Sequence, residues 1–339
     1  MAAQRGPSTL GSWSATILRA AAARGVDASR LAQAAGIDPA TLQEPEARVP
    51  RAALTRLWQL AVEATGDPAF GLTAARHAAQ TSFHALGYSM MASATLKEAF
   101  ERLIRYRRLI GDVIQLGLAE REDRYDFLID VSAPPGAPFE AVDAIVATLL
   151  GQARMITGNR NFAPRRVHLR RPLPKDPAPY RQSFRTEVGF GQPENVIEWA
   201  KDDLENRLPA GNAELARQNE QVLAAFLDRL ERQELGRRVE QAIVNALPNG
   251  TPTKEAIARQ LGMSPRNLQR RLAEESTSFK ELIDAARITL ARDYIDAGRL
   301  SVTEIAFVLG FGDTSSFSRA FKRWTKTSPR DYARRHASR

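Results

Sequence analysis

The last third of the chain repeats one pattern of apolar and polar positions. In each copy, two apolar residues four positions apart share one face of a short helix, and a second such pair follows within a few residues. A glycine comes directly after the first pair in both copies. The apolar positions are Ile257, Leu261, Leu268 and Leu272 in the first copy and Ile305, Leu309, Phe317 and Phe321 in the second.

The residues between the two helices of each copy are typical of a sharp turn. Gly262 and Gly310 stand where the chain must reverse, and glycine accepts a positive φ without a Cβ clash. Ser264 is a suitable cap for the second helix of the first copy, and Asp313 or Thr314 for that of the second copy. The pattern therefore predicts two helix-turn-helix units.

A longer helix is predicted between the two units, at residues 279–297, and Gly298 ends it. At ~1.5 Å per residue it spans roughly 28 Å. With the turns added, the second helices of the two units would lie about 34 Å apart, which is one turn of B-DNA. Its apolar stripe consists of Leu282, Ile283, Ala286, Leu290, Tyr294 and Ile295.

The first two thirds of the chain mix helical and strand-like patterns. Residues 14–78 are helical in pattern, and the period then changes to two at residues 112–118 and 124–131. We expect further helices at residues 84–91, 96–110 and 140–155, a strand at 165–169, and short strands within 188–196. The sequence predicts an α+β N-terminal domain, then an all-α C-terminal domain with two helix-turn-helix units joined by a long helix.

The outer face of each second helix carries side chains of the types that read base edges in a major groove. Arginine pairs with guanine, asparagine or glutamine with adenine, and serine or threonine with either. A polar helix face is usually only solvated, but two copies with glycine turns and outward arginines favour DNA reading. The candidate residues are Arg266, Asn267, Gln269 and Arg270 in the first copy and Thr314, Ser315, Ser316 and Arg319 in the second.

This region resembles the double helix-turn-helix DNA-binding domain of the AraC/XylS family of bacterial transcription regulators. The second copy carries the likeness in Ile305-Ala306, in Gly310-Phe311, in the run SFSRAFK at residues 316–322 and in SPRDY at 328–332. The resemblance implies that base contacts come from the start of each second helix, at the eight positions named above. Pro265 has no backbone N–H, which excludes a phosphate contact from that amide.

The N-terminal region also resembles part of this family, from roughly residue 15 to 215. The likeness lies in the order of elements, in the run LGYSMMASATLKEAFERLIRY and in FGQPENVIEW followed by LPAGN. It is similar to the arabinose-binding-like domain of the ornithine-regulator branch. The resemblance implies that this domain senses a small metabolite, without identifying that metabolite as arabinose.

The positive charge of the chain is concentrated on the repeated region. Residues 236–339 hold 19 Lys and Arg against 11 Asp and Glu, whereas the rest of the chain holds 29 against 28. A basic module joined to a nearly neutral one is the charge distribution expected of a nucleic-acid-binding protein.

Several chemistries lack the residues that they need. The chain has no cysteine, which excludes disulfides, thiolate catalysis and cysteine metal sites. GxSxG, GxGxxG, P-loop and HExxH motifs are absent, so His77 and His84 are expected to be structural. No run of 18 apolar residues or signal-peptide pattern occurs. We therefore expect a cytoplasmic protein without enzyme activity, cofactor, metal or membrane contact.

Four segments are expected along the chain: a disordered N-terminus at residues 1–14, a ligand-sensing domain at 15–212, a linker at 213–235, and the DNA-binding domain at 236–339. The linker is predicted to contain a helix with Leu215, Val222, Phe226 and Leu230 on one side. That apolar side fits either a homodimer contact or packing against its own domain.

The function expected from these features is a ligand-responsive, sequence-specific transcription activator. Double-stranded DNA, RNA polymerase, a small-molecule effector and a second copy of the chain are the expected partners. An alternative keeps DNA binding but has the N-terminal domain respond to a protein partner. A third interpretation, an enzyme with a DNA-targeting tail, has no catalytic motif to support it.

Overall fold

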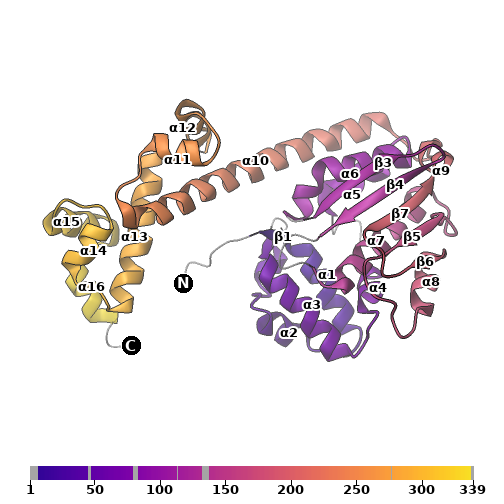
Figure 1. Cartoon of the computed structure of the whole chain (residues 1–339), viewed down its shortest axis with the longest axis horizontal. Coiled ribbons are helices and arrows are strands. Elements are labelled where there is room, and N and C mark those ends of the chain that lie inside the picture. Colours follow the sequence, from indigo (N-terminus) through magenta and orange to yellow (C-terminus); the bar gives the residue numbers. More distant parts are fainter. Residues whose placement is uncertain are drawn as a thin grey trace. The chain divides into compact units, whose positions relative to one another are not determined.

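The computed structural model describes residues 7–44, 47–78, 83–112, 114–131, 137–275 and 277–336. The chain forms two compact units, with the division between Leu227 and Asp228. This division falls inside one long helix, α10 (Ala213–Ala246), which contributes residues to both units (Figure 1).

The N-terminal unit contains a helical part followed by a mixed helix and strand part, which confirms the predicted α+β class. Its helical part is β1 (Ser8–Leu10), α1 (Gly11–Ala22), α2 (Ala28–Ala34), η1 (Thr41–Gln43), β2 (Arg48–Pro50), α3 (Arg51–Thr65), α4 (Phe70–Ala75), α5 (His84–Met91) and α6 (Leu96–Ile110). The second part is β3 (Gln115–Glu120), β4 (Arg124–Asp130), α7 (Phe139–Ile156), β5 (Arg166–His168), α8 (Ala178–Phe184), β6 (Val188–Gly189), β7 (Asn195–Ala200) and α9 (Lys201–Glu205).

The central sheet has the strand order β3-β4-β7-β5-β6, with β5 and β6 parallel and the other pairs antiparallel (Figure 1). Phe127 of β4 lies opposite Ile197 of β7, and both side chains are buried. Phe100 of α6 packs on this face, with its ring centroid 4.9 Å from that of Phe127 and 5.7 Å from that of Trp199. The alternation of buried residues along β4 and β7 thus attaches α6 to the sheet.

Residues 8–14 are ordered, which corrects the expectation of a disordered segment at 1–14; residues 1–6 lie outside the described residues. Strand β1 pairs antiparallel with β2, and the carboxylate of Asp112 accepts hydrogen bonds from the backbone N–H and hydroxyl of Ser8 at 2.8 and 2.9 Å. Arg48 pairs with the same carboxylate at 3.1 Å. Because these partners lie far along the chain, the local composition of the segment did not reveal them.

Three further elements differ from their predicted bounds by more than one residue at an end. The strand expected at 112–118 is β3, which begins and ends later, at Gln115 and Glu120. The expected short strands at 188–196 are β6 and β7, and β7 continues to Ala200 as an inner strand of the sheet, with Ile197 and Trp199 buried. The helix expected within the 213–235 linker continues to Ala246. It buries Ala216 and Leu223 in its first part and Leu235 and Val239 in its second part. A change of buried face along one helix weakens a single amphipathic pattern, which is why the helix end was misplaced.

The C-terminal unit is all helical. After the last turns of α10 it consists of η3 (Leu247–Asn249), α11 (Lys254–Gln260), α12 (Pro265–Glu274), α13 (Phe279–Ala297), α14 (Val302–Val308), α15 (Thr314–Thr325) and α16 (Pro329–His336). Helix α13 runs between the α11–α12 pair and the α14–α15 pair (Figure 1). It contributes Ile283 and Ala286 to the core of the first pair and Ala291 and Ile295 to that of the second. The predicted pair of helix-turn-helix units joined by a long helix is therefore confirmed.

One buried polar group connects α7 with the segments after β5. Asp143 of α7 is fully buried and accepts a hydrogen bond from the hydroxyl of Tyr180 at 2.9 Å, and it pairs with Arg171. Burial raises the pKa of the Asp143 carboxyl to about 7, while the charge of Arg171 opposes that rise. The folded protein therefore holds a proton that an unfolded aspartate releases near pH ~4, so this group's contribution to the free energy of unfolding falls as pH rises from about 4 to 7.

We predict that Arg171→Met lowers the free energy of unfolding by about 3–5 kcal/mol at pH 8, because without the cation the buried Asp143 must either stay charged without a partner or take up a proton that the unfolded chain does not bind at this pH. The loss should be smaller at pH 5, where the Asp143 carboxyl is protonated. Urea unfolding followed by circular dichroism at both pH values measures it. Arg170→Met is the matched control, since Arg170 is an exposed neighbour and should change stability by less than about 0.5 kcal/mol. Equal losses for the two variants at pH 8 would contradict this prediction.

Candidate nucleic-acid interface

In the first helix pair, each helix has a side-chain cap at its N-terminus. Thr253 caps α11 by accepting the backbone N–H of Ala256 at 3.1 Å. Ser264 caps α12 by accepting the N–H of Asn267 at 3.2 Å. Between the helices, Gly262 has a φ of 71°, a conformation that residues with a Cβ rarely adopt. The predicted turn and cap of the first unit are therefore present.

The second pair is built in the same way. Of the two cap candidates, Asp313 caps α15 by accepting the N–H of Ser316 at 2.7 Å, and Thr314 begins the helix. Hydrogen bonds from Ser316 hold the pKa of the Asp313 carboxyl below its usual value. Gly310 has a φ of 74°, and a Cβ there would lie 2.3 Å from Oγ1 of Thr251. Glycine is thus required at 310 for two reasons, conformation and space.

Each pair encloses its own apolar contact, which orients the second helix against the first. Of the residues expected to face inward, all but Leu261 are at most 1% exposed, and so are the small residues where the helices cross. These buried residues are Ile257, Ala258, Leu268 and Leu272 in the first pair and Ile305, Ala306, Leu309, Phe317 and Phe321 in the second, whereas Leu261 is half-buried. With these sides buried, the remaining faces of α12 and α15 are left for polar residues.

The candidate base-reading residues of the first unit lie on the first two turns of α12. Arg266, Gln269 and Arg270 are exposed, and Asn267 is half-buried. The guanidinium of Arg270 donates to Oδ1 of Asn267 at 3.0 Å and also pairs with Glu274. The side-chain oxygen of Gln269 accepts from Nζ of Lys254 at 2.9 Å. Three of these candidates are thus pre-oriented by neighbouring polar groups.

The candidates of the second unit lie at the start of α15. Ser315 and Arg319 are exposed, while Thr314 and Ser316 are half-buried. Arg319 donates to Oγ of Ser316 at 3.3 Å, and that hydroxyl donates to Asp313 at 2.7 Å. Within the described residues, Arg266 of the first unit and Ser315 of the second have no side-chain partner. The second helix of each helix-turn-helix unit therefore carries some candidate side chains that are hydrogen-bonded to neighbours and, in the part of the chain that the structure describes, one that is not.

One residue that the sequence did not single out connects the two units. Arg287 of α13 donates to the carbonyl oxygens of Leu309 and Gly310 at 2.9 and 3.4 Å, in the turn of the second unit. It also donates to Oγ1 of Thr251 at 2.9 Å, just before α11, and its guanidinium lies 4.6 Å from the ring centroid of Phe311. Burial lowers the pKa of this guanidinium. Arg287 therefore ties the second turn to the segment that begins the first unit.

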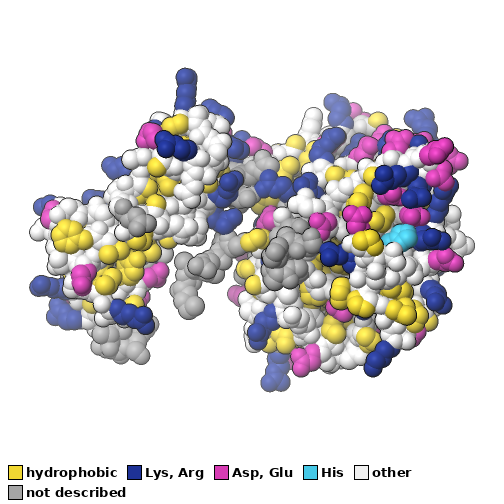
Figure 2. Space-filling model, in the orientation of Figure 1, with side chains coloured by type: hydrophobic (Ala, Val, Ile, Leu, Met, Phe, Trp, Pro, Cys, Tyr) yellow, Lys and Arg dark blue, Asp and Glu magenta, His cyan; other side chains and the backbone are white. Residues whose placement is uncertain are grey.

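The surface of the C-terminal unit has the basic character expected from its composition. On the face shown in Figure 2, Lys and Arg side chains stand out near α12, α15 and α16. Among the described residues, no group of three or more histidine, aspartate or glutamate side chains is placed to hold a metal ion. No helix in the described ranges has both the length and the apolar character needed to cross a membrane.

Comparison with known proteins agrees with this geometry. Residues 25–208 match the family model described as the arabinose-binding domain of AraC transcription regulators, and residues 257–335 match a helix-turn-helix domain model. The chain is 31% identical to the ornithine utilization regulator of Pseudomonas aeruginosa over 91% of both chains. It is 30% identical to an uncharacterized HTH-type transcriptional regulator of Mycobacterium tuberculosis over 92% of both.

Among solved structures, the transcriptional regulator CdpR of Pseudomonas aeruginosa is 26% identical, with a TM-score of 0.42 over 84% of this chain and 93% of that one. The family models and the full-length relatives lead to one conclusion. The chain belongs to the AraC family of transcription regulators, with an arabinose-binding-type N-terminal domain and a DNA-binding helix-turn-helix domain at its C-terminus.

Proposed function

We propose that the protein is a ligand-responsive transcription activator that reads two successive major grooves with α12 and α15. The base-reading residues are Arg266, Asn267, Gln269 and Arg270 on α12, and Thr314, Ser315, Ser316 and Arg319 on α15. The observation that supports this most directly is the equivalent placement of both sets, each on the first turns of a capped helix behind a positive-φ glycine. We place its action in the cytoplasm and assign it no catalytic activity.

In this proposal, affinity and sequence choice come from different side chains. Lys and Arg neutralise phosphates and release counterions, which supplies binding to any sequence. Arg270 and Arg319 supply choice by donating two hydrogen bonds to a guanine edge. To bind the base, the guanidinium of Arg270 must then leave Glu274. Its hydrogen bond to Asn267 continues to orient it.

Regulation requires a path from the N-terminal domain to α10, and α6 provides one. Glu220 of α10 pairs with Arg105 of α6, and Arg102 of α6 lies 4.0 Å from the same carboxylate. A small effector that shifts α6 would change the support of α10, which continues into the C-terminal unit. As an activator, the DNA-bound protein would contact RNA polymerase.

A homodimer through α10 completes the proposal. Ala216 and Leu223 are each 1% exposed, whereas Leu215 and Val222 are 47% and 57% exposed. The exposed pair precedes the buried pair by one residue and so lies about 100° around the helix. Two apolar side chains seven residues apart form a short stripe, which a second copy of α10 would cover.

We predict that Arg270→Ala loses discrimination at one base position, worth about 1–3 kcal/mol, because the bidentate guanine contact is gone. Competition binding of the full chain to a selected site and its single-base variants measures this loss. Lys326→Ala is the control: it should weaken binding to all variants alike and reduce the salt slope by about 1. An unchanged base preference in Arg270→Ala would show that the reading face is wrongly assigned.

We predict that Arg287→Leu relaxes the required spacing between the two half-elements of the DNA site, since the tie between the units is lost. Preference for the native spacing over a spacing changed by one base pair should fall about tenfold, as expected for charge-assisted hydrogen bonds worth about 1.5–3 kcal/mol. Arg292→Leu, an exposed arginine on the same helix, is the matched control. If Arg287→Leu keeps the same spacing preference as Arg292→Leu, then Arg287 does not position the two units.

We predict that the double variant Leu215→Glu and Val222→Glu is monomeric at concentrations where the native chain is dimeric, because each glutamate would be buried without a cation. Sedimentation velocity of the full chain measures the state. Ala224→Glu places one glutamate on another exposed side of α10 and should leave the dimer intact. A native chain that sediments as a monomer would contradict the homodimer.

A further inference from the structure

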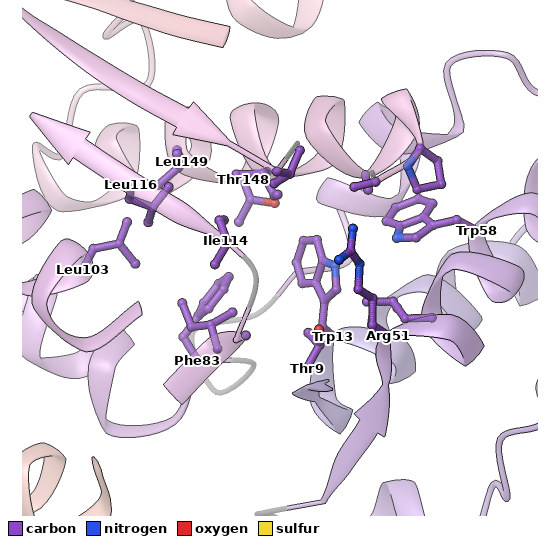
Figure 3. A pocket seen from close by; sticks show the side chains of 18 of the residues that line it. Thr9, Trp13, Arg51, Trp58, Phe83, Leu103, Ile114, Leu116, Thr148 and Leu149 are labelled. Carbon is purple, nitrogen blue, oxygen red and sulfur yellow. The ribbon is translucent and has the colours of Figure 1, made fainter. Parts of the chain in front are cut away.

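The N-terminal unit contains a cavity of about 130 Å³ among α1, α3, α6 and α7. Figure 3 shows Leu103, Leu116 and Leu149 on one side of it, Trp13 and Trp58 on the other, and Thr148 between them. The volume is close to that of an engineered apolar protein cavity of about 150 Å³ that binds benzene. The space therefore fits a molecule built on about one aromatic ring.

The walls of this cavity are almost entirely hydrocarbon. Among the described residues that line it, Arg51 is the one with a formal charge, and none is a carboxylate. A sugar has several hydroxyl groups, and each one left without a partner in such a site costs about 1–3 kcal/mol. A diamino acid would bring charges for which the walls provide no carboxylate. Both classes are therefore poor occupants.

Two polar side chains interrupt the apolar wall on α7. Thr148 and Gln152 are each 6% exposed, and Oγ1 of Thr148 and Oε1 of Gln152 have no hydrogen-bond partner among the described residues. Four residues apart, they share one face of the helix with Cβ atoms roughly 6 Å from each other. Buried polar atoms without partners are rare, and a bound group is one explanation for them. The carbonyl oxygen of Gln152 requires a donor, which a hydroxyl or an N–H group of a bound molecule would supply.

We propose that this cavity is the effector site and that its ligand is a small neutral molecule, an aromatic ring or hydrocarbon body of similar size that bears one hydroxyl or N–H donor. The apolar body fills the space between Trp13 and Leu103, and the donor is held by Thr148 and Gln152. This inference rests on the proposed function, in which the N-terminal domain responds to a small molecule.

The cavity also adjoins the path to α10. Leu103 and Ile110 of α6 line it, and the neighbouring positions Arg102 and Arg105 hold Glu220 of α10. A ligand body between α6 and α7 therefore acts on the helix that supports α10. The same arrangement gives the effector a route to the DNA-binding part of the chain.

Isothermal titration calorimetry of the full chain with five probes tests the site. The probes are 4-methylphenol, toluene, 4-methylbenzoate, L-ornithine and L-arabinose. We expect 4-methylphenol to bind about tenfold more tightly than toluene, the difference expected for a hydrogen bond to a buried group. The other three should not bind measurably.

Two variants connect the binding to the cavity. Thr148→Val keeps the shape but removes the hydroxyl, so 4-methylphenol should lose most of its advantage over toluene while toluene binds as before. Thr148→Val should also be no less stable than the native chain, because the hydroxyl it removes is buried and unpaired. Ala141→Leu adds volume at the cavity wall and should weaken both probes at least about tenfold, by overpacking.

Each remaining outcome overturns a defined part of the proposal. Ornithine, arabinose or 4-methylbenzoate could instead bind more tightly than 4-methylphenol, with Ala141→Leu weakening that binding. This result would overturn the proposed chemical class of the ligand but keep the cavity as the effector site. Absence of probe binding, or binding that neither variant changes, would overturn the cavity as the site. Selection of DNA sites with the same protein preparation distinguishes failure of the cavity proposal from failure of the proposed function. If the protein still prefers particular DNA sequences, the regulator function is retained. If it shows no sequence preference, that function is refuted as well.

Discussion

The close packing of two helices across a glycine turn is the contact on which the C-terminal unit depends. In each copy the apolar faces of both helices are buried against one another, and this fixes which sides of α12 and α15 remain exposed. The turns require positive φ at Gly262 and Gly310, and Gly310 also lies against Thr251. Once these contacts form, the positions of the polar residues on the second helices follow from helical geometry alone.

Two helices of the N-terminal unit carry more than one role. Helix α7 lines the cavity through Thr148, Leu149 and Gln152 and also carries Asp143, which pairs with Arg171 in the interior. Helix α6 lines the cavity through Leu103 and carries the arginines that meet α10. A ligand that enters the cavity therefore contacts α6 and α7, and both helices also make the contacts described above.

Local signals in the sequence were sufficient for much of the C-terminal unit. The glycine turns, the cap at Ser264 and the full length of α13 were predicted because each depends on residues within a few positions. The candidate reading residues could also be placed on α12 and α15, since the buried stripe determines the outer face. The helix at 96–110 was predicted with its observed bounds from its amphipathic pattern, and the structure adds a side-chain cap at Thr95.

What sequence reasoning missed depends on partners distant in the chain. Strand β1 is held by Asp112, 104 residues away from Ser8. In the sequence, Arg287 is one of several charged residues on a predicted helix, and its contact with the turn at Leu309 is visible only in the folded structure. The cavity has walls from several separate elements, and no one of them has a distinctive pattern. Such features belong to the tertiary structure, and a single sequence gives no periodicity or cap by which to find them.

The central claim is that the two helix pairs present their arginines to neighbouring grooves of one duplex. Selection of binding sites from randomised oligonucleotides with the full chain, at moderate ionic strength, tests it most directly. We predict a site with two conserved elements whose centres lie about 10 base pairs apart, one helical turn. A single element, or no sequence preference at all, would contradict the account.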